Sequence, residues 1–347
     1  MNKSADYETV HTPDDTAGEP TYEETVQTLI DGSVRRNFDP YDDIQWDSPD
    51  YAIAPDDPRW ILPGNIDLGK TAWYQNLLEE EQIRIGQRRM ADVAKVGEQF
   101  ERLLVQAINI GNMGQRSGSV NREYSDLEAR EEINHIMMFE KLVDRLGVDT
   151  KGARTWFRKL LPLVVPAASL MPGGMWAVVL AGEEPIDHVQ KEYLRGGDNM
   201  HPLMRDVMAI HVAEEGRHIS YAHERLSEDV PKMSFASKAT LAVGLPAAMR
   251  VLGDVIVKPS PEALADMNVP DEVADEMWGS KTQSARDSRR DMFPDARMLA
   301  EQIGLKTPEG EKKTLVSRIG DTAWRAFRVD GRSSRYRSEP NRTHVAA

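Results

Sequence analysis

Apolar residues recur at three- and four-residue steps along much of this chain, which is the spacing of one face of an α-helix. The clearest case is the stretch from residue 70 to about 111, where no proline interrupts the pattern. Its apolar positions are Leu77, Ile83, Ile85, Met90, Val93, Val96, Phe100, Leu104 and Ile108. The pattern predicts one long helix, followed by a polar turn from Gly111 to Asn121.

The same spacing predicts helices through the rest of the chain. The expected ranges are about 122–146, 175–194, 202–227, 233–257, 261–279 and 291–303. No alternating pattern typical of a β-strand extends beyond a few residues, and no internal repeat is visible. We therefore expect an all-α protein.

The segments on either side of the helical part differ from it in composition. Residues 1–40 are polar and acidic, and we expect a mostly disordered tail with a short helix around Tyr22–Ile30. Residues 41–69 are rich in Asp, Pro and Trp, which predicts an extended arm packed on the domain. The helical domain is expected over 70–330, followed by a basic disordered tail over 331–347.

One stretch, Leu160 to Gly182, is apolar enough to raise the question of a membrane span. Three prolines and the Gly173-Gly174 pair divide it into short pieces. A buried loop followed by a core helix explains this pattern better than a membrane span. We expect no membrane association, and the absence of a leader-like start favours the cytoplasm.

Composition restricts the chemistry that the chain can perform. It contains no cysteine, which excludes disulfides, thiolate metal sites and cysteine nucleophiles. Any metal ligands must therefore be nitrogen and oxygen atoms, which suits iron or manganese. The net charge of -14 is concentrated in residues 1–50, which hold 13 acidic and 3 basic residues. Nucleic acid is not an expected partner for so acidic a chain.

The helix expected over 202–227 carries an unusual group of polar residues on one face. His211 lies four residues before Glu215, and His218 lies three residues after it, so their side chains project together. Two imidazoles and a carboxylate are costly to bury without a partner. A second Glu-x-x-His motif, Glu132 and His135, stands on the helix expected over 122–146. Taken alone, His211 would more often be a core histidine, but two such motifs on separate helices favour a metal site.

Paired Glu-x-x-His motifs, with one glutamate from each of two more helices, hold two metal ions in ferritin-like bundles. We therefore expect a ferritin-like diiron helical bundle with additional helices and an acidic N-terminal extension. On the helix over 175–194, Glu183 and Glu184 compete for the lone position. Glu183 is favoured because it lies on the apolar stripe, whereas Glu184 continues to Asp187 on an expected solvated face. On the first long helix, periodicity does not separate Glu98 from Glu101.

These residues resemble a known family, the AurF-type (p-aminobenzoate N-oxygenase-like) diiron oxygenases. The resemblance covers about residues 75–305 and rests most strongly on the unbroken His211-x-x-x-Glu215-x-x-His218 pattern. The run Gly97-Glu98-Gln99 resembles the text around the family's first lone glutamate, which favours Glu98 over Glu101. The resemblance thus implies seven metal ligands: Glu98, Glu132, His135, Glu183, His211, Glu215 and His218.

The resemblance also implies an activity. Two iron ions, or iron with manganese, would use O2 as co-substrate to oxidise the nitrogen of an aromatic or other amine toward hydroxylamine and nitro products. In this family the reaction passes through a peroxo-diferric intermediate, with no catalytic residues beyond the metal ligands. Electrons would come from an external donor, a ferredoxin or an NAD(P)H-dependent reductase, because the chain has no flavin or nicotinamide motif. We also expect a homodimer.

Two other functions remain open from the residues. Arg217, between Glu215 and His218, is similar to a motif of acyl-carrier-protein desaturases, so a diiron oxidase, desaturase or hydroxylase acting on C–H bonds is the main alternative. An iron-storage bundle is the other, although the chain is about twice as long as such a bundle requires. The three remaining histidines of interest do not fit the metal pattern, and His223 is expected at the surface: His188, His201 and His223.

Overall fold

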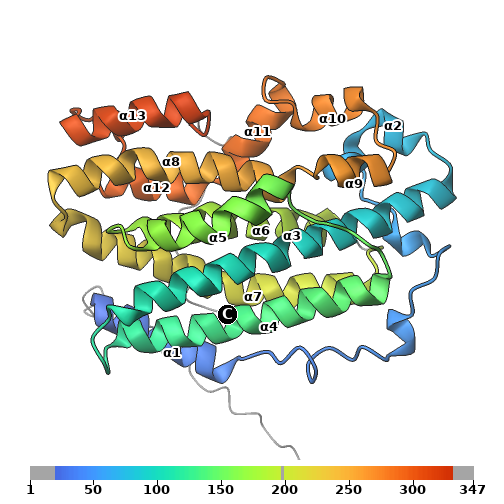
Figure 1. The fold of residues 1–347 in the computed structure, drawn as a ribbon, viewed down its shortest axis with the longest axis horizontal. Helices are drawn as coiled ribbons and strands as arrows, with labels where there is room; N and C mark the ends of the chain where they lie inside the picture. The colour runs from blue at the N-terminus through green and yellow to red at the C-terminus, as the bar shows by residue number, and fades with distance from the viewer. Residues whose placement is uncertain (1–19, 197–198, 331–347) are drawn as a thin grey trace, which may run out of the picture.

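The computed structural model describes residues 20–196 and 199–330, and within these residues it contains helices but no β-strand. Figure 1 shows the long helices lying side by side in layers. The helices are α1 (Tyr22–Arg35), α2 (Ala72–Gln75), α3 (Glu79–Met113), α4 (Val120–Leu146), α5 (Thr155–Ser169), α6 (Gly174–Gly196), α7 (Pro202–Asp229), α8 (Phe235–Val257), α9 (Pro261–Asp266), α10 (Asp271–Trp278), α11 (Gln283–Met292), α12 (Pro294–Gln302) and α13 (Leu315–Phe327). The all-α prediction is confirmed.

Four helices, α3, α4, α6 and α7, form the bundle that positions the site. α3 packs mainly against α4, and α6 packs against α7, while α4 also contacts α7. At Gly182 the backbone of α6 approaches α3 so closely that an added Cβ would lie 1.7 Å from the Phe100 ring. Only glycine fits this position, and the contact joins the two helix pairs.

The remaining helices cover this bundle. α1 lies across α4 and α7, and α8 packs between α6 and α13 (Figure 1). The stretch Phe235–Asp266 is long and apolar enough to cross a membrane, but half of its apolar 18-residue window is buried inside the protein. Extensive packing on α6 and α13 explains its apolar character as that of a core helix.

Among the described residues, buried apolar side chains form two clusters along the bundle rather than one. The arm-side cluster contains Trp46 and Trp60 from the irregular segment before α2, together with the first turns of α3. The far-side cluster contains the second half of α3 and the start of α6. On α7 the arm-side cluster ends at Met208 and the far-side cluster begins at Ile219. The predicted metal ligands lie between the two clusters.

Several helices differ from their predicted bounds. The predicted helix over 70–111 is divided into α2 and α3, because the Gln82 side-chain amide donates to the carbonyls of Tyr74, Gln75 and Leu77 and stabilises the break. The predicted loop after Leu160 is instead the end of α5, which accommodates two prolines. Those prolines lie four residues apart, so both of the lost hydrogen bonds fall on the same side of the helix.

The C-terminal part of the chain departs further from the prediction. The single helix expected over 261–279 is α9 and α10, divided at Asn268, whose φ of 56° is left-handed. The helix expected over 291–303 corresponds to α12, which is preceded directly by α11. α13 is missing from the predicted set, although its Thr314 capping box and buried Trp324 mark it clearly in the structure. Of the tail predicted over residues 1–40, residues 1–19 lie outside the described residues, as does the predicted tail over 331–347. The described part of the first contains α1, which packs against α4 and α7.

Candidate metal centre

Six of the seven predicted ligands meet in the centre of the bundle, and all of them are buried. α4 supplies Glu132 and His135, α6 supplies one glutamate, and α7 supplies the remaining three residues. One group consists of His135, His211 and Glu215, and a second consists of Glu132, Glu183, Glu215 and His218. In each group one ligand atom from every residue lies within 4.8 Å of the others. Because Glu215 belongs to both groups, it is placed to bridge two ions.

Close contacts between donor atoms show how tightly the two groups are joined. His218 Nδ1 lies 2.7 Å from Glu132 Oε1, and His135 Nδ1 lies 3.2 Å from Glu132 Oε2. His211 Nε2 lies 3.3 Å from Glu215 Oε1. Glu132 therefore lies between the imidazoles of the two Glu-x-x-His motifs.

The structure does not bring Glu98 to this cluster. Its carboxylate pairs with Lys95 and Arg102 on the same helix, and the distance to Lys95 Nζ is 2.8 Å. Glu101 lies one turn further along α3 and is fully buried, with Oε1 3.3 Å from His211 Nε2. The geometry therefore favours Glu101 as the lone glutamate of α3, and Glu98 is a partner of surface cations.

Glu183 and Glu184 are both buried, but only Glu183 faces the cluster. Glu184 instead lies 3.3 Å from His223 Nε2, and burial raises its pKa to about 7. The expected solvated face at Glu184 and Asp187 is therefore wrong, because α8, α11 and α12 cover this side of α6 and α7. His223 is correspondingly only partly exposed, with 22% of its side chain accessible.

Many polar atoms of the cluster have no hydrogen-bond partner among the described residues. They include both carboxylate oxygens of Glu183 and of Glu215, and one carboxylate oxygen of Glu101. A buried carboxylate without a partner is expensive, because it has lost its hydration shell. Four carboxylates, Glu101, Glu132, Glu183 and Glu215, would balance two divalent cations. The unpartnered oxygens and the nitrogen–oxygen donor set therefore fit two iron ions.

Two more glutamates, Glu131 and Glu214, form a second ring outside the ligands. Each contacts a ligand histidine on the other helix of the pair α4 and α7. Glu131 of α4 lies 2.8 Å from His218 Nε2 of α7, and Glu214 of α7 lies 2.9 Å from His135 Nε2 of α4. In both histidines Nε2 is thus placed to donate to a carboxylate, which leaves Nδ1 directed at the cluster. Such contacts fix the tautomer and orientation of a metal-ligating imidazole.

Arg217 holds the two outer glutamates in place. Its Nη2 lies 3.1 Å from Glu131 Oε1 and 3.5 Å from Glu214 Oε1, and its Nε donates to Ser33 on α1. Neither glutamate was predicted as part of the site, although each directly precedes a ligand glutamate in an uninterrupted Glu-Glu pair. Those doublets were the available signal. Arg217 thus has a local role in the ring that needs no acyl substrate.

Burial and neighbouring charge set the protonation of the imidazoles. Burial lowers the pKa of His135, but hydrogen bonds to Glu132 and Glu214 outweigh it and raise the value to about 10. The pKa of His211 falls to about 4 because burial dominates there. Burial, reinforced by neighbouring carboxylates, raises the pKa of Glu101 and Glu183 well above the ordinary value. Without cations, the cluster therefore holds protons that bound metal would displace.

A helical bundle that gathers carboxylates and imidazoles from four neighbouring helices defines the class of ferritin-like proteins with a two-metal site. The comparison with known families makes the class specific. The family described as p-aminobenzoate N-oxygenase AurF matches residues 19–304, and the chain belongs to this diiron family.

Close relatives occur in mycobacteria. The chain is 44% identical over 333 residues to the uncharacterized protein Rv0885 of Mycobacterium tuberculosis H37Rv and to the uncharacterized protein Mb0909 of Mycobacterium bovis. In both cases the similarity covers 96% of this chain and 95% of the relative. The similarity therefore extends beyond the family match at both ends.

Proposed function

We propose that the protein is a diiron oxygenase that uses O2 to oxidise the nitrogen of an amine. The observation that carries this proposal is the buried group of four carboxylates and three imidazoles with unpartnered oxygens at its centre. Membership of the AurF family supplies the reaction class. An iron-storage role is disfavoured, because the second ring of glutamates fixes the ligand orientations more closely than storage requires.

We assign the ligands of the two ions from the two groups. Glu101, His135 and His211 would hold one ion, Glu132, Glu183 and His218 would hold the other, and Glu215 would bridge them. Bound iron would supply O2 activation in two-electron steps. His211, which is neutral at pH 7 because burial lowers its pKa to about 4, is ready to bind without losing a proton.

The surrounding residues would exclude water and hold the ligands still. The Phe139 ring lies tilted beside His211 with ring centroids 4.9 Å apart, and apolar residues of the arm-side cluster pack next to the site. In the first step one oxygen atom enters an N–H bond of the amine and the other leaves as water. That step consumes two protons and two electrons, so a separate reductase or ferredoxin would supply the electrons.

Metal content and an amine panel test the proposal together. Protein loaded anaerobically with ferrous iron should retain close to two iron ions per chain, as measured by inductively coupled plasma mass spectrometry. With O2 and a chemical reductant it should convert arylamines to hydroxylamines and nitroarenes. Liquid chromatography would measure these products. A single bound ion, or desaturated and hydroxylated acyl products with unchanged amines, would contradict N-oxygenation.

A further inference from the structure

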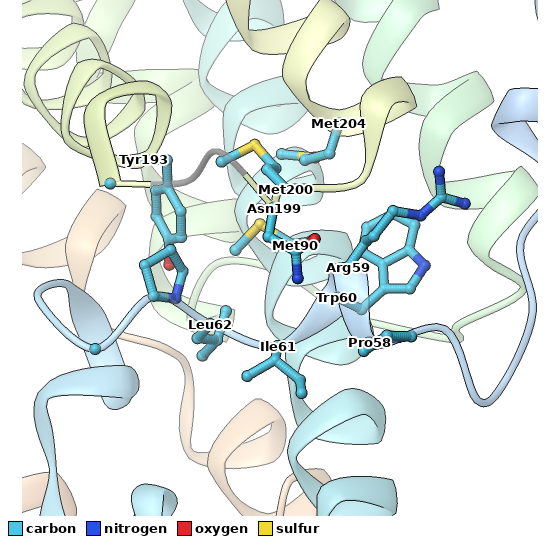
Figure 2. Close-up of a pocket in the computed structure, with 13 residues that line it drawn as sticks. Pro58, Arg59, Trp60, Ile61, Leu62, Met90, Tyr193, Asn199, Met200 and Met204 are labelled. Carbon is cyan, nitrogen blue, oxygen red and sulfur yellow. The ribbon is translucent and has the colours of Figure 1, made fainter.

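A cavity of about 480 Å³ opens at the arm-side end of the bundle. Trp60 and Leu62 of the arm, Met90 of α3, Tyr193 of α6 and Met204 of α7 line it (Figure 2). The volume lies in the range of small-molecule sites, and the lining combines aromatic faces with flexible thioethers. Its chemistry suits a flat apolar molecule.

The helices that line the cavity are also the helices that carry the metal ligands. Met204 lies seven residues before His211, Tyr193 lies ten after Glu183, and Met90 lies eleven before Glu101. At 1.5 Å per residue the cavity is about 10–16 Å from the cluster along the bundle axis. A small substrate could therefore pass from one to the other inside the same bundle.

Buried side chains on α3 and α7 lie between the cavity and the cluster, on the same helix faces as the ligands. Met90 is eleven residues from Glu101 and Ala94 is seven, and both intervals return to within about 20° of the same helix face. Met204 and Met208 stand at the same two intervals before Glu215. Small and flexible residues thus face inward along the path, and all of these side chains are buried. Methionine can change rotamer to admit a ligand without a large backbone movement.

Gln190 provides the polar group on this path. It lies seven residues after Glu183 on α6, and therefore on the same inward face about 10.5 Å toward the cavity. Its side chain is 2% exposed, and its Oε1 has no hydrogen-bond partner among the described residues. A buried carbonyl oxygen without a donor is costly, and an amine N–H would satisfy it.

The charges around the cavity argue against an acidic substrate. Arg59, at the rim, binds the carboxylate of Asp57 through both Nε and Nη2, with distances of 3.0 and 2.6 Å. Figure 2 shows its guanidinium pointing away from Met90 and Met200. Arg89, the neighbour of the lining residue Met90 in the sequence, is buried in ion pairs with Asp67 and Asp92. Both cations are therefore already paired with carboxylates of the protein.

We propose that this cavity is the vestibule for a neutral aromatic amine, which enters between Met90 and Met204 and is oriented by the Gln190 amide. The inference rests on the proposed N-oxygenation for its choice of an amine, and it adds the substrate class and the entrance. Gln190 is a positioning residue, since it holds the amine without touching the metal centre.

Equilibrium binding to the protein as isolated, without reductant, tests the vestibule separately from turnover. The probes are 4-butylaniline, its methyl analogue 4-butyltoluene, 4-aminobenzoate and dodecanoate. We expect 4-butylaniline to bind at least tenfold more tightly than 4-aminobenzoate and severalfold more tightly than 4-butyltoluene. Tighter binding of 4-aminobenzoate would overturn the neutral class, and tighter binding of dodecanoate would identify an acyl channel instead.

Three substitutions locate the binding. Gln190→Leu should remove the preference for 4-butylaniline over 4-butyltoluene, while binding of 4-butyltoluene stays the same. Met204→Trp should weaken both probes at least tenfold, and Met200→Trp at the rim serves if Met204→Trp does not fold. Met113→Trp, at an exposed position on the far end of α3, is the matched control and should change nothing.

The two proposals fail in different ways. Selective binding of 4-butylaniline that is lost in Met204→Trp, but without any oxidised product, would support the vestibule and contradict N-oxygenation. Amine oxidation with a KM unchanged in both Gln190→Leu and Met204→Trp would support N-oxygenation and overturn the vestibule.

Discussion

The choice between Glu98 and Glu101 turns on a single helical turn. Both are buried on α3, yet Glu98 pairs with Lys95 and Arg102, whereas Glu101 contacts His211. The sequence around Glu98 resembles that of the family. The direction in which each side chain points from α3, however, decides which carboxylate reaches the cluster. Three residues on a helix differ by about 60° in direction, which separates the two sides of α3.

We expect Glu101→Ala to lose most bound iron and Glu98→Ala to keep it. Glu101→Ala removes one negative charge that would balance the cations in a buried site. Loss of a buried charge partner is strongly unfavourable. Glu98→Ala removes only ion pairs with partly exposed cations, which contribute little. Iron per chain after gel filtration measures both. Equal iron content in the two variants would contradict the assignment of Glu101, rather than Glu98, as the ligand from α3.

At the scale of elements, α4 and α7 are related by an exchange of contacts. Each carries a Glu-Glu-x-x-His motif, and the first glutamate of each supports the histidine of the other. The exchange fixes the rotation of both helices about their own axes, because turning either helix would break both contacts. Arg217 then ties the pair to α1 through Ser33.

Glu131→Gln should therefore weaken metal binding without removing a ligand. The amide is neutral and supports the His218 imidazole less well, and loss of such outer contacts typically costs about 10–100-fold in metal affinity. Competition with a chelator measures the affinity, and circular dichroism checks that the helices remain. Glu123→Gln, in the exposed first turn of the same helix, is the control. Unchanged metal affinity in Glu131→Gln would show that the contact of Glu131 with His218 does not contribute to metal binding.

The contact of α6 with α3 gives a second element-scale prediction. Gly182→Ala would place a methyl group against the Phe100 ring and force the helices apart next to Glu183. We expect a loss of about 1–3 kcal/mol in the free energy of unfolding, the usual cost of overpacking. Gly244→Ala in α8, where nothing lies within 4 Å of the added Cβ, should instead stabilise by up to about 1 kcal/mol. Chemical denaturation of both variants measures the difference.

For the whole molecule, the buried acids make the metal-free protein sensitive to rising pH. Burial raises the pKa of Glu128 to about 8 and that of Asp92 to about 6, and glutamate contacts raise that of His135 to about 10 against its burial. Between pH 5.5 and 8 the folded chain therefore holds protons that the unfolded chain has released. Stability falls with pH wherever the folded state binds more protons.

We expect the melting temperature of metal-free protein to be several degrees lower at pH 8 than at pH 5.5. His211 opposes this trend, because its pKa of about 4 lets only the unfolded chain bind a proton near pH 6. It is one group against several. Metal-loaded protein should show the reverse, since bound cations keep the ligands deprotonated and their affinity rises with pH. A metal-free melting temperature that rises with pH would contradict these protonation states.

The sequence predicted most of the features that follow from helical periodicity, and few of those that depend on contacts between residues far apart in the chain. Helical spacing located α4, α6 and α7 closely. The histidine motifs identified five of the residues that meet in the bundle, and the apolar stripe of α6 identified the sixth, Glu183. It did not separate Glu98 from Glu101, because both positions face buried surroundings. The outer ring was also missed, since the contacts of Glu131 and Glu214 join residues 87 and 79 positions apart.

The division of the apolar interior into an arm-side and a far-side cluster bears on how the molecule opens. Across the middle of the bundle the four central helices meet mainly through charged groups, and the apolar contacts described at that level are those of Phe100 with Gly182 and of Phe139 with His211. Amide hydrogens there should exchange with solvent through local openings well below the free energy of global unfolding. Bound iron would close this weak level, and hydrogen exchange measured by mass spectrometry should slow most in the middle turns of α4 and α7. The metal centre would then hold together two separately packed ends of one bundle.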